Sequence, residues 1–401
     1  MMKKNIKKNV EDLFALTPVQ EGMLFHYLKE PDSDIYFEQL CLQISGKIDI
    51  DVFEKAWNFV IASNEMLRTV FRWEKIKSPT QVVLKKYHLK IRFHDLSTDE
   101  NNAKDRLLKL AEIKRHDKQE RFDLREFPFR VTLCRLGPSK YEMILSNHHI
   151  LYDGWSNGII LKEFFSAYEN FARGKEPVKP GKSKFKEFVT WIRSREKAGQ
   201  EEFWKDYLRD FDAVVGLPVK RQSALDTGTG MAEAAGRSMG IGNLKSELPK
   251  RTGDKAAKFV KKNKITMASL LYSVYGMLLL KYCNGDDTVF GITTSGRSAN
   301  IKGIEDMVGL FVNTLPLRVN AGPGEEIIRC LHRVNEAARR IEAYETTPLV
   351  EVKKYRQQES NEELFDSIVV IENYPLDNVI AAAGGKGFAV DTQYVNTVGL
   401  R

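Results

Sequence analysis

The stretch EMILSNHHILYDGW (142–155) decides how this chain is interpreted. Residues 142–147 have the composition of a buried strand, two histidines follow, and Asp153 and Gly154 then turn the chain into a helix. A strand end presents a side chain well, because the backbone is held while the tip stays open. Neighbouring side chains on extended backbone point to opposite faces. We therefore expect His149 to face a cavity and His148 to pack as its structural neighbour.

The chemistry of this run points to proton handling. A neutral imidazole, with an ordinary pKa near 6.5, can accept a hydrogen bond from an amine or take its proton. Asp153 can be a base, an orienting partner or a member of a structural ion pair, and Gly154 permits backbone conformations that other residues resist. Two histidines beside an Asp-Gly turn can also be ordinary packed residues. Metal binding is disfavoured, because no second cluster with ligand spacing is present.

The composition limits the classes of protein that fit. The 401 residues suit two domains, and 42% hydrophobic with 29% charged residues is typical of a globular protein. No apolar run or N-terminal apolar core indicates a membrane span or a secretory signal, so we expect a cytoplasmic protein. The net charge of +8 is spread along the chain, without a nucleic-acid-binding motif. The scattered cysteines predict buried thiols, with no zinc site or disulfide framework: Cys41, Cys134, Cys283 and Cys330.

The hydrophobic patterns alternate between those of strands and those of helices. In the first half they predict a strand over 39–45, a helix from Phe53, a strand pair at 68–74 and 81–86, a helix over 102–120, a hairpin at 130–136 and 142–147, and a helix over 160–171. Linkers are expected at 173–184 and 226–240, with a helix around 191–208 between them. In the second half they predict helices over 266–282 and 325–343, with Thr266 as N-cap, and strands over 288–293, 310–319 and 367–373. We expect Pro316 to favour an edge strand or a bulge.

The run HHILYDGW (148–155) resembles the HHxxxDGW signature of condensation domains in nonribosomal peptide synthetases. Five further stretches are similar to motifs of that family, in the family's order, with Asn64 where many members have histidine: LTPVQEGMLFH (16–26), NEMLRTVFRWE (64–74), RFDLREFPFRV (121–131), TTSGRSANIKGIEDMVGLFVNTLPLRV (293–319) and VVIENYPL (369–376). Together they cover the chain from about residue 9 to about residue 376.

The resemblance implies an α/β fold of two chloramphenicol-acetyltransferase-like subdomains in a V, with a central tunnel. It places the first subdomain at 15–180 and the second at 181–401. The implied reaction joins a donor peptidyl or aminoacyl thioester to the α-amine of an acceptor aminoacyl thioester. Both are carried on phosphopantetheine arms of carrier proteins, and no cofactor is bound by this domain. An adjacent adenylation domain is a further implied partner.

The resemblance also suggests roles for single residues. His149 would position or deprotonate the attacking amine. Asp153 would be a structural residue, paired with Arg68 of the second motif. Gly154 would lie by the tunnel, where a side chain would obstruct the donor arm, and Trp155 would pack. Two residues of the long 293–319 block are expected to line the tunnel: Ser295 and Asn313.

The two ends of the chain carry further expectations. Residues 1–14 resemble a docking region for the acidic C-terminal tail of an upstream synthetase subunit, and a solvated N-terminus is the alternative. The second subdomain is expected to be truncated, because family members usually continue well beyond VVIENYPL.

Rival readings of the same residues remain. Trp155 directly after Gly154 disfavours an epimerase, the two histidines disfavour a heterocyclisation domain, and the flanking motifs fit free-standing CoA acyltransferases poorly. A catalytically impaired or non-catalytic module that binds carrier proteins is the alternative function.

Overall fold

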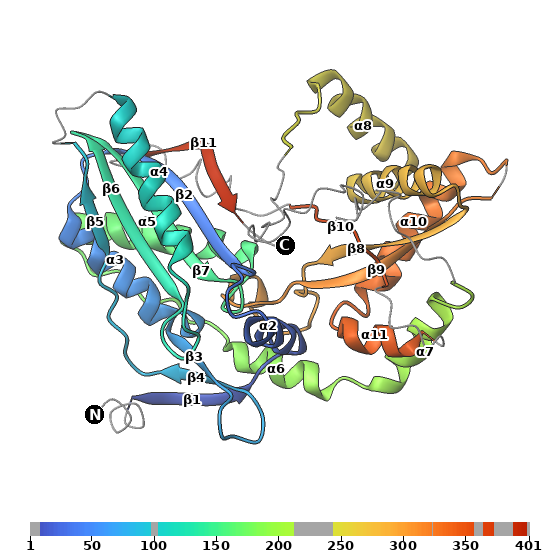
Figure 1. The fold of residues 1–401 in the computed structure, drawn as a ribbon, viewed down its shortest axis with the longest axis horizontal. Coiled ribbons are helices and arrows are strands. Elements are labelled where there is room, and N and C mark those ends of the chain that lie inside the picture. The colour runs from blue at the N-terminus through green and yellow to red at the C-terminus, as the bar shows by residue number, and fades with distance from the viewer. Residues whose placement is uncertain are drawn as a thin grey trace, which may run out of the picture. The chain divides into compact units, whose positions relative to one another are not determined.

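The computed structural model describes residues 9–97, 103–211, 244–322, 324–356, 364–372 and 388–398. Helices and strands alternate through both halves of the chain, as the hydrophobic patterns predict (Figure 1). The chain forms two compact units. The first consists of Met1–Glu196, Ser295–Val312 and Glu372–Arg401, and the second consists of Lys197–Thr294 and Asn313–Ile371.

A five-stranded sheet forms the centre of the first unit. Its strand order is β11-β2-β7-β6-β5, with β7 in the middle. All neighbours pair antiparallel except β5 and β6, which are parallel. The strands are β2 (Phe37–Gly46), β5 (Arg92–Asp95), β6 (Phe129–Gly137), β7 (Lys140–His148) and β11 (Phe388–Val398). The predicted hairpin is thus β6 and β7, and its second strand is held on both sides.

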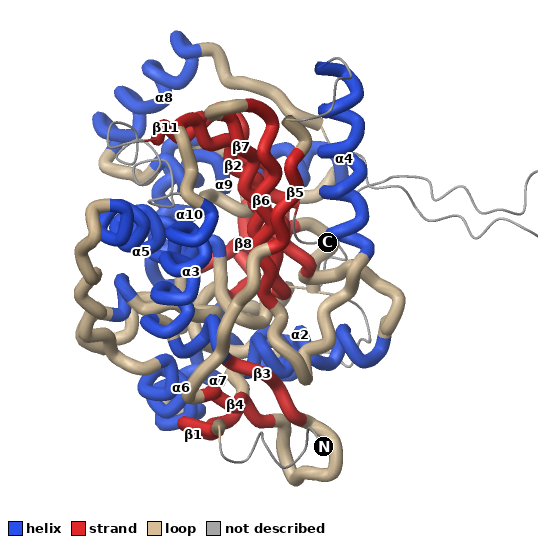
Figure 2. The backbone as a smooth tube through the Cα atoms, turned by 90° about the vertical axis from the view of Figure 1, so that its left-hand side faces the viewer, coloured by secondary structure: helices blue, strands red, loops and turns tan. Residues whose placement is uncertain are grey.

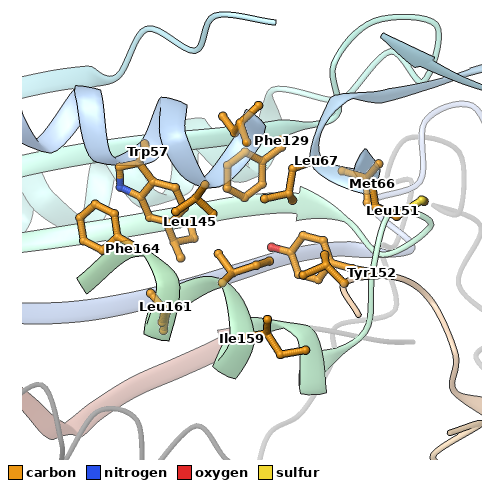
Figure 3. Close-up of a cluster of buried hydrophobic side chains, with 14 of the residues drawn as sticks. Trp57, Met66, Leu67, Phe129, Leu145, Leu151, Tyr152, Ile159, Leu161 and Phe164 are labelled. Carbon is orange, nitrogen blue, oxygen red and sulfur yellow. The ribbon is translucent and has the colours of Figure 1, made fainter. Parts of the chain in front are cut away.

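Helices cover both faces of this sheet (Figure 2). On one face lie α3 (Ile50–Ser63) and α5 (Gly154–Ala172), and on the other lies α4 (Ala103–Gln119). The main core lies under α3 and α5, where the rings of Trp57 and Phe164 stack 4.5 Å apart and Phe129 and Leu145 rise from the sheet (Figure 3). A smaller cluster under α4 contains Cys41 and Cys134. Burial raises the pKa of Cys41 to about 11 and that of Cys134 to about 12, so both stay thiols at neutral pH.

A second, three-stranded sheet completes the first unit, with antiparallel order β1-β4-β3. Its strands are β1 (Val10–Ala15), β3 (Thr69–Arg72) and β4 (Thr80–Leu84). Helix α2 (Pro18–Lys29) follows β1 and begins with a capping box between Thr17 and Gln20. Because residues 10–14 pair with β4, they belong to the folded unit. Asn9 also bonds to Lys85 and Lys86, so the predicted docking segment 1–14 overlaps this sheet.

The second unit is built around a three-stranded sheet of order β10-β8-β9, whose strands are β8 (Asp287–Thr294), β9 (Asn313–Asn320) and β10 (Ile368–Val369). Its helices are α7 (Lys197–Tyr207), α8 (Lys250–Asn263), α9 (Met267–Cys283), α10 (Ile327–Glu342) and α11 (Leu349–Tyr355). The core gathers Trp204, Phe290, Leu315 and Leu317, all buried. Thr266 caps α9 as predicted, since its hydroxyl accepts from the Ser269 amide at 3.0 Å.

Most predicted elements are confirmed, and the differences have local causes. Pro316 lies on β9, an edge strand, as expected. The helix expected around 191–208 is two helices, α6 (Phe185–Ser194) and α7, because the chain becomes extended at Arg195. Ile327, the first residue of α10, is 65% exposed. Cys283 is only half-buried, and the predicted strand at 367–373 pairs over two residues alone. The predicted linker at 226–240 lies outside the described residues.

The division into units does not follow a single cut at residue 180. The first unit extends to Glu196 and also contains Ser295–Val312. Phe311 explains this, because its ring packs 4.5 Å from Phe188 and 5.2 Å from Phe185 on α6. The end of the chain returns to the first unit as well, where β11 pairs with β2.

A test of length and apolar composition finds no single helix in the described part of the chain that could cross a membrane. The pair α8 and α9 passes that test only when taken together, and the two helices are bent by 105° at their junction.

Gly296 allows a close approach of two backbone segments in the first unit. Its φ is +68°, and a Cβ atom there would lie 1.8 Å from the Phe311 carbonyl oxygen. Gly303 has a similar φ of +72° with open space around it.

We expect Gly303→Ala to lower the free energy of unfolding by about 1–2 kcal/mol, the cost of left-handed backbone. Gly296→Ala should cost a further 1–3 kcal/mol or so from the collision. Urea unfolding of both variants measures the difference, and equal losses would contradict the close approach.

Candidate active site

The central strand of the five-stranded sheet positions the two histidines. β7 pairs with β2 so that His148 lies opposite Phe37, and with β6 so that Asn147 lies opposite Phe129. The amide of His148 donates to the Pro128 carbonyl at 3.1 Å. The amide of His149 donates to the Tyr36 carbonyl at 2.8 Å. Both backbones are therefore held from two sides, at the place where the strand ends.

His148 is a buried, neutral side chain. Its Nδ1 accepts the Ile150 amide at 3.2 Å, so the ring hydrogen is on Nε2. Nε2 is buried and finds no acceptor among the described residues. The rings of Tyr27 and Tyr36 lie 5.8 and 6.0 Å away, centroid to centroid. Burial, with smaller contributions from His149 and Arg121, lowers the pKa of His148 to about 3. This environment agrees with the packing role expected for His148.

His149 has the opposite tautomer. Its Nδ1 lies 3.0 Å from the Tyr152 carbonyl oxygen, which can only accept, so the neutral ring carries its hydrogen on Nδ1. Nε2 then has a free lone pair, and no hydrogen bond from another described residue engages it. Nδ1 also lies 3.3 Å from Glu38 Oε1. Burial alone would lower the pKa of His149, but Glu38, Asp153 and the Tyr152 carbonyl together outweigh it and raise that pKa. Of the two histidines, His149 has the nitrogen suited to accept a proton.

Asp153 is a fully buried carboxylate that caps α5. Its Oδ1 accepts from the Ser156 amide at 3.2 Å, and its Oδ2 accepts from the Phe311 amide at 3.0 Å. The amide of Asp153 itself donates to the Gly309 carbonyl at 3.1 Å. One side chain therefore joins the start of α5 to the segment 295–312.

Arg297 is the ionic partner of Asp153. Its guanidinium donates to Asp153 Oδ1 at 3.1 Å, and both side chains are almost completely buried. The same guanidinium donates to the carbonyls of Ile304 at 2.7 Å and Met307 at 2.9 Å, and it lies 4.0 Å from the Phe311 ring centroid. A buried pair that is hydrogen-bonded in this way is costly to break from one side, because the remaining charge stays buried.

The prediction that Arg68 pairs with Asp153 is wrong. Arg68 instead pairs with Glu11 of β1 at 2.5 Å and donates to the Leu84 carbonyl. Arg68 immediately precedes the edge strand β3, and its guanidinium turns toward the small sheet, whereas Arg297 reaches Asp153. Arg68 therefore supports β1 and β4 and does not touch the histidine loop.

Gly154 and Trp155, the next two residues of the motif, lie at the start of α5. Gly154 is the first residue of α5. The Trp155 indole donates to the Glu305 carbonyl at 3.0 Å and packs against the core, which agrees with a packing role.

The two residues expected to line a tunnel fall in different units. Ser295 belongs to the first unit, is exposed, and accepts the Arg297 amide at 3.3 Å. Asn313 belongs to the second unit, where its buried amide donates to the carbonyls of Glu345 and Thr347 at 2.8 and 2.7 Å. Both hydrogens of the Asn313 amide are therefore used in hydrogen bonds within the second unit.

In the part of the chain that the structure describes, no group of three or more His, Cys, Asp and Glu side chains is arranged to hold a metal ion. The arrangement around β7 instead offers a buried imidazole with one free nitrogen, next to a braced loop. These are the parts of a site that moves or holds a proton.

Comparison with known families places nearly the whole chain in one of them. A family model described as "Condensation domain" matches residues 10–395. The chain belongs to the condensation domain family. Peptide-bond formation between substrates bound to carrier proteins is the role of this family, and it is a transferase reaction.

Curated relatives are nonribosomal peptide synthetases. The chain is 34% identical over 375 residues to tyrocidine synthase 2 of Brevibacillus parabrevis, covering 92% of the chain and 10% of the relative. It is 32% identical over 375 residues to gramicidin S synthase 2 of Brevibacillus brevis, covering 92% of the chain and 8% of the relative. The chain thus spans a small part of the length of these multidomain relatives, in which condensation domains work with carrier and adenylation domains.

Solved structures show the same fold. The first condensation domain of the CDA synthetase superposes with a TM-score of 0.70 at 18% identity, covering 97% of this chain and 88% of that one. The condensation domain described here therefore has the chloramphenicol-acetyltransferase-like fold, with mixed helices and strands, as expected.

Two contacts of this condensation domain were not predicted. Arg297 lies in the long motif block, but nothing in the order of its residues singles it out as the partner of Asp153. Glu38 lies near the start of β2, where only its position before an alternating apolar pattern is visible. A charged residue beside a predicted buried strand is a weak signal, because most such residues face solvent.

A double-mutant cycle tests which arginine braces Asp153. Asp153→Ala and Arg297→Ala should show a coupling free energy of about 1 kcal/mol or more in urea unfolding, because the two charges are in contact. Asp153→Ala and Arg68→Ala should be additive within about 0.5 kcal/mol, because these residues do not touch. Strong coupling of Asp153 to Arg68 alone would contradict the observed pairing.

The neutral state of His148 predicts a dependence of stability on pH. An unfolded histidine titrates near 6.5, whereas folded His148 titrates near 3. The unfolded state therefore binds the extra proton, and stability present above pH 6.5 is lost as the pH falls toward 3. Between pH 7 and pH 5 this loss is on the order of 2 kcal/mol. His148→Asn keeps an acceptor for the Ile150 amide and does not titrate, so urea unfolding should show a correspondingly smaller loss. The same loss in both proteins would contradict the neutral assignment.

Proposed function

We propose that this chain forms an amide bond between a donor peptidyl or aminoacyl thioester and the α-amine of an acceptor aminoacyl thioester. Both substrates are carried on phosphopantetheine arms of carrier proteins. The observation that carries the proposal is the tautomer of His149, whose Nδ1–H is engaged by the Tyr152 carbonyl at 3.0 Å while Nε2 keeps its lone pair. Such a nitrogen accepts a hydrogen from an amine. The family to which the chain belongs supports the same reaction.

The reaction requires little covalent chemistry from the protein. A thioester is already activated, and an α-amine with a pKa near 8 is roughly one tenth free base at pH 7. Holding the amine and the carbonyl at attack distance supplies several kcal/mol by itself. His149 then has two tasks, to orient the amine and to receive its proton. No acyl-enzyme intermediate is needed.

The neighbours of His149 have supporting roles in this proposal. Asp153 braces the loop between β7 and α5 through Arg297 and the Phe311 amide and does not act as a base, since its oxygens are occupied. Gly154 leaves room beside the loop for the donor arm. Trp155 packs, and His148 holds the backbone conformation through the Ile150 amide.

The proposal also assigns partners by their chemistry. The chain receives a donor carrier and an acceptor carrier, and an adenylation domain loads the acceptor amino acid. Residues 1–8 are the candidate docking segment for the acidic tail of an upstream synthetase subunit, since Asn9 bonds to Lys85 and Lys86 and residues 10–14 are used in β1.

A reconstituted condensation assay tests the function. Donor and acceptor carriers loaded with aminoacyl thioesters are mixed with the protein, and dipeptidyl carrier is followed by mass spectrometry. We expect product with the wild type, and about a hundredfold or greater loss of rate with His149→Ala. His88→Ala is a matched control, because His88 is exposed and its ion-pair partner is Glu54 on α3.

The outcomes separate the two candidate functions. Equal product from wild type and His149→Ala would contradict the role of His149. Binding of loaded carriers without any dipeptide would favour the alternative, a non-catalytic module that binds carrier proteins.

A further inference from the structure

Four buried residues form a closed ring of contacts that includes the active-site imidazole. Glu38 Oε1 lies 3.3 Å from His149 Nδ1, and Glu38 Oε2 accepts from Asn147 Nδ2 at 3.2 Å. Asn147 Oδ1 accepts from the Tyr152 hydroxyl at 2.9 Å, and the Tyr152 carbonyl accepts from His149 Nδ1 at 3.0 Å. Each member is oriented by its two neighbours, so Glu38 is aimed at the imidazole by the fold.

The backbone places Glu38 where this contact can form. Glu38 on β2 is the register partner of Asn147 on the central strand β7, two residues before His149. The Tyr152 side chain is fully buried under α5 (Figure 3), and its hydroxyl fixes which end of the Asn147 amide faces Glu38. The Glu38 carboxylate therefore cannot turn away from His149 without breaking the other hydrogen bonds among these four residues.

Because Glu38 is buried, a positive charge on His149 would stabilise its carboxylate. Glu38 is 8% exposed, and a buried carboxylate is costly unless a positive charge or several donors compensate it. Among the described residues, His149 is the only basic side chain that forms an ion pair with Glu38. The nearby Glu372 is a further acidic group, and desolvation together with Glu38 raises its pKa. Protonation of His149 therefore compensates the buried charge of Glu38.

We propose that Glu38 is a positioning residue for the condensation reaction, which holds His149 in the Nδ1–H tautomer and stabilises the imidazolium formed when Nε2 takes a proton. This inference rests on the proposed function. As the amine attacks the thioester carbonyl, a C–N bond forms and the C–S bond breaks. The proton lost by nitrogen goes to His149 Nε2 and then to the departing thiolate of the donor arm. Glu38 touches neither substrate and acts through the imidazole.

The charged groups around His149 determine the sign of the effect. Glu38 faces it from β2, Asp153 from the start of α5, and neutral His148 precedes it on β7. Burial disfavours the imidazolium, but the carboxylates and the Tyr152 carbonyl outweigh it, so the pKa of His149 is raised. The acid limb of the rate profile should then lie above the ordinary histidine value near 6.5.

The variant Glu38→Gln tests this proposal, because it removes the negative charge of the side chain and keeps its size and shape. In Glu38→Gln, NMR titration of isotopically labelled protein should show the pKa of His149 lowered by about one unit or more, because an adjacent opposite charge is removed. The acid limb of kcat should move to lower pH by the same amount. The plateau kcat should fall about tenfold, while KM for the loaded carriers stays unchanged, because Glu38 does not contact them. Glu38→Asp should retain part of the raised pKa.

Glu142→Gln is the matched control. Glu142 is a buried carboxylate at the opposite end of β7, paired with Lys114. Its substitution should lower stability and leave the pKa of His149 and the rate profile unchanged. An unchanged His149 pKa in Glu38→Gln, or an equal shift in Glu142→Gln, would overturn the proposal.

The wild-type protein provides a second measurement, should Glu38→Gln not fold. The ¹⁵N chemical shifts of neutral His149 must report a hydrogen on Nδ1 and a bare Nε2, and a hydrogen on Nε2 would overturn the inference. Both NMR readouts use the protein without carriers. A wild type that forms no dipeptide would therefore contradict the proposed function, whereas these readouts decide the linkage between Glu38 and His149.

Discussion

The Asp153 carboxylate is the contact on which the active-site loop depends. It caps α5, binds Arg297 at 3.1 Å and accepts the Phe311 amide at 3.0 Å, while fully buried. Without it, the Arg297 guanidinium would lose the carboxylate that balances its charge and the Phe311 amide would lose its acceptor, which is more costly in the interior than the loss of an exposed ion pair. The same contact explains why residues 295–312 belong to the first unit although the chain on either side of them lies in the second.

The loop next to this brace contains adjacent histidines with opposite tautomers. The loop after β7 turns so that an amide meets Nδ1 of His148, whereas a carbonyl meets Nδ1 of His149. The first ring thereby carries its hydrogen on Nε2 and the second on Nδ1, which leaves Nε2 of His149 for the proposed role of proton acceptor. Two identical side chains on neighbouring residues thus receive different tautomers from the backbone groups that they face.

A buried carboxylate completes the site at a cost in desolvation. Glu38 is kept near His149 by Asn147, which is in turn oriented by Tyr152. In a low-dielectric interior, such a ring concentrates the effect of one charge on one imidazole. In the proposed mechanism, local stability is exchanged here for control over a proton.

The family and most elements could be predicted from the sequence. The strand 142–147, the Thr266 cap and the edge position of Pro316 follow from local patterns, because alternation and capping depend on residues within a few positions of each other. The partners of Asp153 and His149 depend on the folded arrangement instead. Arg297 is 144 residues from Asp153, and Arg68 offered the same charge, so composition could not choose between them. The pairing of β2 with β7 brings Glu38 to His149, and strand register over such a distance is a property of the folded sheet.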